Sequence, residues 1–292
     1  MTYTTLLESV YQDLYEPRAL RSRRPNTKRL YRTTLRYFNL YLNRRAKLSD
    51  LNDATVSGFA AWRLENGLAK RSVNKDLFNL LALWRWLHKK GHVKNWPDVA
   101  LEVPPVRVPV ALMREEVARL MQSLQAETEP VGPFRGADFW GALALVIWDT
   151  AERIGAVMAL TWDCVDLKNG WVRFVAEHRK GAREDNVLPV DKDTIAALKK
   201  IQRDSGLVFR WPYSSTYIYY RLAKIMRRAG LPDNSLYKFH VIRKSVASHY
   251  EAAGGNATEL LGHTSRKVTL AYLDPRIVKR KSAKDLLFRP GT

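Results

Sequence analysis

Residues 240–272 read HVIRKSVASHYEAAGGNATELLGHTSRKVTLAY, and the spacing of the polar residues in this stretch decides how the C-terminal half is interpreted. His240 and Arg243 are three positions apart, so on a helix they lie on one face, a turn from each other. His263 closes a Leu-Gly-His triplet, and Tyr272 follows nine positions later. The pattern predicts helices at about 240–252, 257–262 and 266–272, with Asn256 as the cap and Glu259 as the third residue of the middle one.

Upstream of this stretch, two further basic residues stand in distinct local contexts. Arg153 comes just beyond a predicted apolar helix at Trp140–Thr150. Lys180 lies between two short apolar runs, 171–175 and 186–190, the first of which alternates at strand period, and together they predict a β-hairpin with Lys180 near its tip. Further helices are predicted at 114–124, 193–203 and 214–229.

A proline-rich segment divides the chain. Residues 103–109 contain three prolines, which disfavour helix, and we place a linker at 103–110. Apolar residues before it recur at helical spacing, so residues 1–102 are expected to form a helical bundle in which Phe38 and Trp84 pack in the core rather than stack on bases. The expected fold class is mainly α with a small β-hairpin (α+β), and residues 111–292 form the second domain with a C-terminal tail.

Charge points to a polyanionic partner. The chain carries 49 Lys and Arg against 29 Asp and Glu, net +20, which favours DNA or RNA. Between Pro17 and Ser49 there are eleven basic residues and no acidic one. An ordinary solvated face is the alternative, but natural surfaces usually mix the two signs. The candidate DNA-binding residues are Arg21, Arg23, Arg24, Lys28, Arg29, Arg32, Arg36, Lys70, Arg71 and Lys75.

Several classes of protein are disfavoured by what the sequence lacks. A single cysteine, Cys164, excludes an intramolecular disulfide, and neither a signal-peptide pattern nor an 18-residue apolar run occurs, so a cytoplasmic protein with no membrane partner is expected. No zinc-spaced Cys/His cluster, paired-carboxylate pattern or phosphate-binding glycine loop is evident. We therefore expect no metal and no nucleotide cofactor.

The remaining residue types suit chemistry on a phosphodiester. Negative charge that gathers on the phosphate oxygens can be stabilised by the planar guanidinium groups of Arg153 and Arg243, with His240 as a hydrogen-bond donor or proton acceptor. The phenol of Tyr272 has an ordinary pKa of about 10 and becomes a nucleophile only where cations or a base assist it. Lys180 is the candidate proton donor to the leaving oxygen, with Arg179 or Arg183 as alternatives.

The ordered set of Arg153, Lys180, His240, Arg243, His263 and Tyr272 resembles the catalytic residues of the tyrosine recombinase (phage integrase) family. The segment from Ala159 to Asp166 is similar to the family's W-x-D box, and Val187-Leu188-Pro189 is similar to the V-P-L that follows the family's lysine. His240–Ala247 is similar to the family's H-x-L-R box. Tyr219, Tyr237 and Tyr250 compete as nucleophiles, but only Tyr272 has the nine-residue offset from a Leu-Gly-His.

The chain departs from the family pattern at three places. Ala156 stands where the family often has an acidic residue, and Glu152 is the candidate replacement for that orienting carboxylate. Lys244 stands where histidine or arginine is commoner. The segment from Arg243 to His263 is a few residues short. These departures concern the groups that support the site rather than the six candidate catalytic residues.

The resemblance implies strand cleavage through a 3′-phosphotyrosine, without ATP or metal, by four protomers acting on two double-stranded DNA sites. It also implies a monomer free in solution, bacterial, archaeal or phage origin, a helical core-binding (SAM-like) domain at 1–102 and possible accessory DNA-bending proteins. The tail, with Leu286, Leu287 and Phe288, is expected to dock on a neighbouring protomer or on its own subunit. Two alternatives stay open: relaxation of DNA by a type IB topoisomerase, and a non-catalytic DNA-binding regulator.

Overall fold

The computed structural model describes residues 2, 4–179, 181 and 184–278. The chain forms two compact units, Met1–Val106 and Arg107–Thr292, which are described separately. Most of the described residues are helical, and within them one small sheet lies in the second unit, which confirms the expected fold class.

The N-terminal unit is a helical bundle built on α3 (Pro25–Leu42), α4 (Asp53–Glu65) and α5 (Lys70–Lys89), preceded by α1 (Leu7–Val10), a π-helical turn (Tyr11–Tyr15) and α2 (Glu16–Ala19). Helix α3 begins with Pro25 in its first turn and ends at Leu42, and the next residue, Asn43, reverses the chain with a positive φ of 50°. Phe38 and Trp84 are fully buried in the apolar core, so the prediction that they pack is confirmed.

A buried carboxylate ties the three long helices of this bundle together. Asp76 on α5 accepts hydrogen bonds from the Thr34 hydroxyl on α3 at 2.7 Å and from Arg63 Nε on α4 at 3.1 Å. The Arg63 guanidinium also stacks on the Tyr37 ring, with its carbon 3.9 Å from the ring centroid. Because a buried charge is costly unless it is paired and hydrogen-bonded, this network fixes how the helices face each other.

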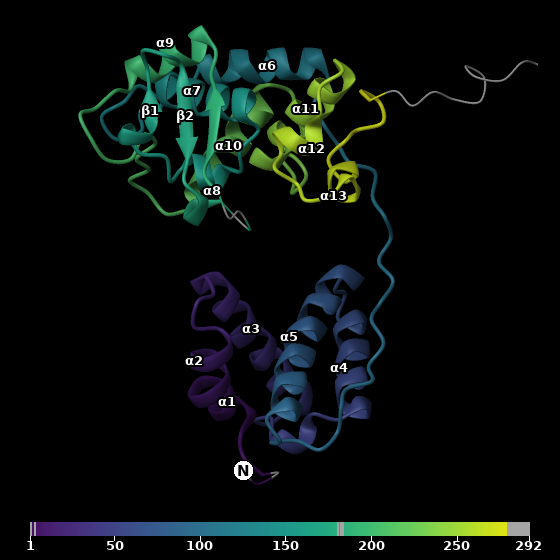
Figure 1. The fold of residues 1–292 in the computed structure, drawn as a ribbon. Coiled ribbons are helices and arrows are strands. Elements are labelled where there is room, and N and C mark those ends of the chain that lie inside the picture. Colours follow the sequence, from purple (N-terminus) through teal and green to yellow (C-terminus); the bar gives the residue numbers. More distant parts are fainter. Residues whose placement is uncertain (1, 3, 180, 182–183, 279–292) are drawn as a thin grey trace, which may run out of the picture. The chain divides into compact units, whose positions relative to one another are not determined.

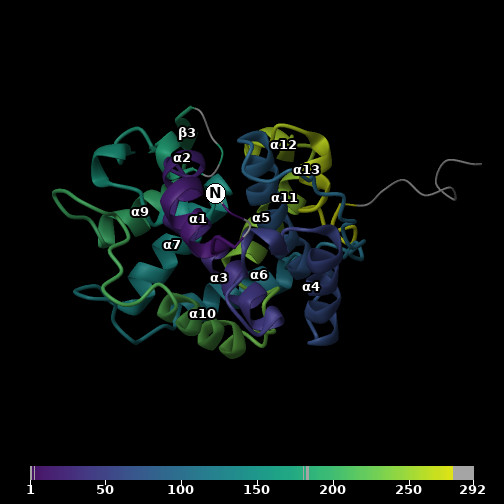
Figure 2. The same cartoon turned by 90° about the horizontal axis from the view of Figure 1, so that it is seen from below.

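The second unit surrounds α7 (Gly136–Thr150), an almost wholly apolar helix that packs against α6 (Arg114–Gln125), α9 (Lys192–Lys200) and α11 (Phe239–Ala252). A helix that is apolar on all sides has to be buried. The other helices are α8 (Ile154–Val157), α10 (Tyr217–Arg228), α12 (Ala257–Leu260) and α13 (Arg266–Leu270). Both views show α11, α12 and α13 side by side (Figure 1, Figure 2).

The sheet has three antiparallel strands in the order β1 (Val165–Asp166), β2 (Trp171–Phe174) and β3 (Asn186–Pro189). Trp171 pairs with Pro189 and Phe174 with Asn186. The predicted hairpin is therefore confirmed, whereas β1 was not predicted because two residues are too short to show alternation.

Several helix boundaries differ from those predicted: α7 begins at Gly136 rather than at Trp140, α9 ends at Lys200 rather than at 203, and α12 ends at Leu260 rather than at 262. Helix α10 begins at Tyr217 rather than at 214, and α13 ends at Leu270, so Tyr272 follows that helix instead of lying within it. Asn256 caps α12 as predicted, with its side chain accepting from the backbone N–H of Thr258 and of Glu259. The C-terminal tail beyond Val278 lies outside the described residues.

Candidate active site

Four of the predicted catalytic side chains converge at the ends of α11, α12 and α13. The Tyr272 ring centroid lies 5.0 Å from that of His240 and 4.8 Å from that of His263. The guanidinium carbon of Arg243 is 5.7 Å from the centroid of the same ring. A phenol, two imidazoles and a guanidinium thus meet around one point, although they come from positions up to 32 residues apart in the chain.

The arginine on α11 is buried and held in place from two sides. Arg243 is 1% exposed; its Nη2 donates to the carbonyl of Leu261 at 3.0 Å and its Nη1 to the carbonyl of Ala151. Nε is buried and has no partner among the described residues. Burial and the nearby charge of Arg153 lower the pKa of Arg243 to about 10, so it remains a cation at neutral pH.

The turn after α7 brings Arg153 to the site. Ala151 adopts a left-handed conformation with φ of 50°, which is uncommon for a residue with a side chain and reverses the chain at the end of α7. Arg153 then stands at the N-cap of α8. Its charge contributes to lowering the pKa of His240, Arg243 and His263.

The two histidines are neutral at neutral pH. Although His240 is exposed as a whole residue, desolvation of its ring, followed by the charges of Lys244, Arg243 and Arg153, lowers its pKa to about 4. Burial and the same two arginines lower the pKa of His263 to about 4. Nδ1 of His263 lies 3.1 Å from the Thr269 hydroxyl, and its buried Nε2 has no partner among the described residues. Because a neutral imidazole has one N–H and one free nitrogen, each ring can donate or accept one hydrogen bond.

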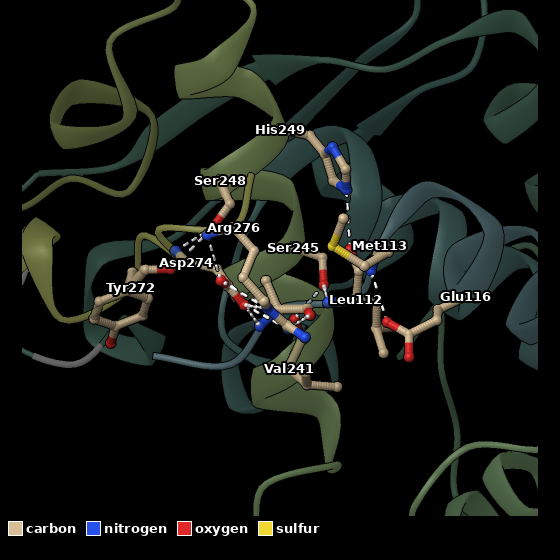
Figure 3. A network of polar contacts seen from close by, with 11 residues as sticks. Leu112, Met113, Glu116, Val241, Ser245, Ser248, His249, Tyr272, Asp274 and Arg276 are labelled. Carbon is tan, nitrogen blue, oxygen red and sulfur yellow. Dashed lines mark hydrogen bonds and ion pairs between the residues drawn. The ribbon is translucent and has the colours of Figure 1, made fainter. Parts of the chain in front are cut away.

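The backbone around Tyr272 is fixed by hydrogen bonds to its neighbours. Its N–H donates to the Thr269 carbonyl at 2.8 Å, and its carbonyl accepts from the Ser248 hydroxyl of α11 at 3.2 Å. The Ser248 hydroxyl in turn accepts from the N–H of Asp274 at 3.0 Å (Figure 3). The Tyr272 backbone is therefore hydrogen-bonded to α11, the helix that carries His240 and Arg243.

A second polar cluster joins the tyrosine segment to the start of this unit. The Asp274 carboxylate is fully buried and accepts from the N–H of Ala111 at 2.8 Å and from Arg276 Nη2 at 2.7 Å (Figure 3). Arg276 Nη2 also donates to the Ala111 carbonyl at 2.9 Å. Although burial acts to raise the pKa of Asp274, the hydrogen bonds from Arg276 and Ala111 outweigh it and hold that pKa below its usual range. Next to Ala111, the N–H of Leu112 donates to the Ser245 hydroxyl at 2.7 Å.

Glu152 brings a carboxylate to the site. It is 2% exposed, and its Oε1 accepts from Arg179 Nε at 2.6 Å. Its Oε2 accepts from the N–H of Arg153 at 3.1 Å and lies 3.9 Å from Arg243 Nη1. Ala156, where an acidic residue was the family expectation, is buried and apolar, so the carboxylate beside the arginines comes from Glu152.

Not every predicted residue lies in this cluster. Lys180 and Arg183 fall outside the described residues. Most of the candidate DNA-binding residues are exposed on the N-terminal unit, where Arg29, Arg32 and Arg36 follow one face of α3, and Arg71 and Lys75 follow one face of α5. An exposed apolar side chain continues each face, Leu40 at 58% and Phe78 at 55%.

Some candidate DNA-binding residues have intramolecular partners. Arg32 pairs with Glu16 at 2.9 Å and Lys28 lies 3.7 Å from the same carboxylate. Lys70 pairs with Glu102 at 3.4 Å. These pairs are partly exposed, and such pairs contribute little to stability, so a phosphate can compete for the cations.

Sequence reasoning missed the groups that support the site. Ser248, Thr269, Asp274 and Arg276 carry no periodic or motif signal, and their roles depend on contacts between segments far apart in the chain. Among the described residues, no group of three or more His, Cys, Asp or Glu could hold a metal ion, and no helix is long and apolar enough to cross a membrane.

Comparison with known proteins gives a consistent result. Residues 111–277 match the phage integrase family, and residues 18–91 match the phage integrase N-terminal SAM-like domain. The tyrosine recombinase XerC of Xanthomonas axonopodis is 28% identical over 241 residues, which cover 78% of this chain and 75% of that protein. The tyrosine recombinase XerD of Shewanella oneidensis is 24% identical, with 91% of each chain covered.

Two solved structures share the fold. The Tn1549 transposon integrase in complex with transposon right end DNA aligns with a TM-score of 0.74 at 14% identity, covering 92% of this chain and 95% of that one. A lambda integrase dimer bound to a core site aligns with a TM-score of 0.69 at 19% identity, covering 95% of this chain and 99% of that one. At these identities the likeness concerns the fold alone.

Proposed function

The chain belongs to the phage integrase family and is a site-specific tyrosine recombinase; on that premise we propose that Tyr272 is the nucleophile with which it cleaves DNA. The observation that carries this proposal is the position of the Tyr272 ring, whose centroid lies 5.0 Å and 4.8 Å from those of two imidazoles and 5.7 Å from the Arg243 guanidinium carbon. Each of these groups can bind an oxygen of a phosphodiester or of the attacking phenol.

In the proposed reaction the Tyr272 oxygen attacks a DNA phosphorus atom and forms a 3′-phosphotyrosine. The bond to the 5′-oxygen breaks, and that oxygen takes a proton from Lys180 to leave as a hydroxyl. The 5′-hydroxyl of a partner strand then attacks the phosphotyrosine and releases Tyr272. One phosphoester bond is exchanged for another in each step, so no external energy source is needed.

The roles of the other residues follow from their charge. Arg243 and Arg153 are cations that bind the non-bridging oxygens and stabilise the charge gathered there. His240 is neutral and 5.0 Å from Tyr272 between ring centroids, so it accepts the phenolic proton or donates to the phosphate. His263, whose Nε2 has no partner among the described residues, donates to a phosphate oxygen.

We assign DNA binding in the N-terminal unit to the basic faces of α3 and α5. We place the linker between the two domains at residues 103–110. The DNA-bound structures of the Tn1549 and lambda integrases support double-stranded DNA as the partner. A lambda integrase tetramer bound to a Holliday junction supports the assembly of four protomers on two sites. The expected compartment is the cytoplasm, where such DNA lies. A type IB topoisomerase activity would differ in needing no partner duplex.

Covalent trapping tests the proposal. Nicked duplexes from the DNA flanking the gene lose a short 5′-hydroxyl fragment on cleavage, so the adduct accumulates and migrates slowly on a denaturing gel. We expect an adduct with the wild type and none with Tyr272→Phe. Tyr250→Phe, which alters an exposed tyrosine on α11, is the matched control and should cleave normally. An adduct that persists in Tyr272→Phe would refute the assignment.

A further inference from the structure

One side of α5 combines cations with an exposed phenylalanine. Side chains that recur at alternating spacings of four and three residues share one side of a helix. In α5 the outward side chains at these spacings, called here the α5 stripe, are Arg71, Lys75, Phe78, Ala82, Arg85 and Lys89. Phe78 is 55% exposed, whereas Leu77, Leu80 and Trp84 on the opposite side are buried in the core. The α5 stripe therefore presents an aromatic ring to solvent between two pairs of cations.

The charge of the α5 stripe has one sign. The single acidic residue of α5, Asp76, is buried in the bundle. Lys70, which precedes the stripe, pairs with Glu102 at 3.4 Å, but Arg71 and Lys75 lie within ion-pair distance of no carboxylate of the described residues. Because natural surfaces usually mix the two signs, a stripe with cations alone indicates a polyanion as its partner.

The length of the stripe suits the major groove of DNA. An α-helix rises 1.5 Å per residue, so Arg71 and Arg85 are about 21 Å apart along the helix axis. The major groove of B-DNA is about 12 Å wide and admits an α-helix. When α5 crosses the groove, its terminal cations can reach phosphates on both edges. Phe78 lies seven residues from each of the two arginines, so its ring faces the base edges in the middle.

The chemistry of the side chain indicates what it contacts there. A phenyl ring carries no hydrogen-bonding group, and the apolar group that distinguishes one base pair from another in the major groove is the C5-methyl group of thymine. A singly exposed apolar side chain needs no functional explanation by itself. Phe78 differs because it stands midway along a cationic stripe whose partner is DNA.

We propose that Phe78 is a specificity-determining residue that recognises a thymine in the bound DNA through its C5-methyl group. The cations of the α5 stripe contact phosphates and supply affinity for any sequence, whereas the ring adds a preference at one base pair. This inference rests on the proposed binding of DNA by the basic face of α5.

Replacing thymine with uracil tests the contact, because it removes the methyl group and keeps every hydrogen-bonding group of the base. The probe is the duplex from the DNA flanking the gene that the protein binds, shortened until it holds one protomer. Each thymine in turn is replaced with deoxyuridine, and the affinity is measured by fluorescence anisotropy. The variants are Phe78→Ala and Lys75→Ala. Leu101→Ala is the matched control, because it truncates an apolar side chain that is 42% exposed and lies outside the helices.

We expect the wild type to bind about fourfold more weakly when one particular thymine loses its methyl group, the factor that burial of a single methyl group supplies. Phe78→Ala should bind the thymine and uracil duplexes equally. Lys75→Ala should bind every duplex more weakly but keep the preference, and Leu101→Ala should match the wild type. A preference that persists in Phe78→Ala, or a wild type that shows none at any thymine, would overturn the inference.

The salt dependence of binding separates failure of the inference from failure of its premise. Lys75→Ala should reduce the slope of log affinity against log salt concentration by about 0.9, whereas Phe78→Ala removes no charge and should leave the slope unchanged. If Lys75→Ala leaves both slope and affinity unchanged, α5 does not contact DNA, and the premise and the inference fail together. A lower slope in Lys75→Ala together with an intact preference in Phe78→Ala overturns the inference alone.

A second copy of the chain is the competing partner for the Phe78 ring. In that case Phe78→Ala would bind more weakly only on a duplex that holds two protomers, and its preference for thymine on the shortened duplex would equal that of the wild type. This outcome would also overturn the inference.

Discussion

Replacing Asp274 with asparagine tests how the tyrosine segment is held. The Asp274 carboxylate is fully buried and surrounded by donors: the N–H of Ala111, the N–H of Arg276 and the Arg276 guanidinium. An amide replaces one oxygen with a donor, so in either orientation a donor faces a donor. Leaving the N–H of Ala111 unsatisfied costs about 1 to 3 kcal/mol. The side chain of Arg276 is 53% exposed, so removing its ion pair adds only about 1 kcal/mol or less.

We therefore expect Asp274→Asn to lower the free energy of unfolding by about 1 to 4 kcal/mol, measured by urea denaturation. Because the Asp274 N–H and the Ser248 hydroxyl connect this cluster to the carbonyl of Tyr272, adduct formation should also slow, by about 10- to 100-fold. Asp185→Asn is the matched control, since Asp185 also accepts from a backbone N–H and an arginine but is exposed, and it should unfold like the wild type. Wild-type stability and cleavage in Asp274→Asn would refute the reasoning.

Three further predictions concern other parts of the molecule. In an NMR titration of the free protein, His240 and His263 should protonate near pH 4 rather than near the ordinary histidine pKa of 6.5. Because the unfolded chain then binds protons more readily than the folded one, the free energy of unfolding that these residues contribute is fully present above pH 6.5 and falls as the pH drops towards 4. Titration midpoints near pH 6.5 would contradict this. Replacing Arg71 and Lys75 with alanine should reduce the slope of log affinity against log salt concentration by about 0.9 for each phosphate that is no longer neutralised. The affinity for duplex DNA would be measured by fluorescence anisotropy, and an unchanged slope would show that α5 does not contact the DNA. Arg221→Ala removes a buried guanidinium that binds Glu127 Oε1 and the carbonyl of Pro130, while Arg228 still pairs with the other oxygen of Glu127. It should lower the unfolding free energy by about 1 to 3 kcal/mol in urea, because buried acceptors lose their donors, and an unchanged unfolding free energy would show that the Arg221 contacts are dispensable.

Local patterns in the sequence predicted the helices and the hairpin because the information lies within each segment. The apolar run at 140–150 had to be a buried helix, and the cap at Asn256 is set by residues two and three positions away. The convergence of Arg243, His240, His263 and Tyr272 was expected from family resemblance rather than from periodicity.

The supporting groups could not be predicted in the same way. Asp274 meets Ala111 across 163 positions and Arg179 meets Glu152 across 27, and neither pairing leaves a local signal. The sequence suggested that Glu152 takes the place of the acidic residue that the family often has at position 156. The pairing of Glu152 with Arg179, however, depends on the left-handed turn at Ala151. Long-range polar contacts of this kind follow from the tertiary fold, so they become visible only once the fold is known.

Mass spectrometry of the trapped complex is the most direct test of the central claim. After cleavage of a nicked duplex, protease digestion and nuclease trimming, the peptide that retains a nucleotide would be sequenced. The account predicts one modified peptide, with a 3′-nucleotide on Tyr272. A nucleotide on another residue, or one attached through its 5′ end, would contradict it.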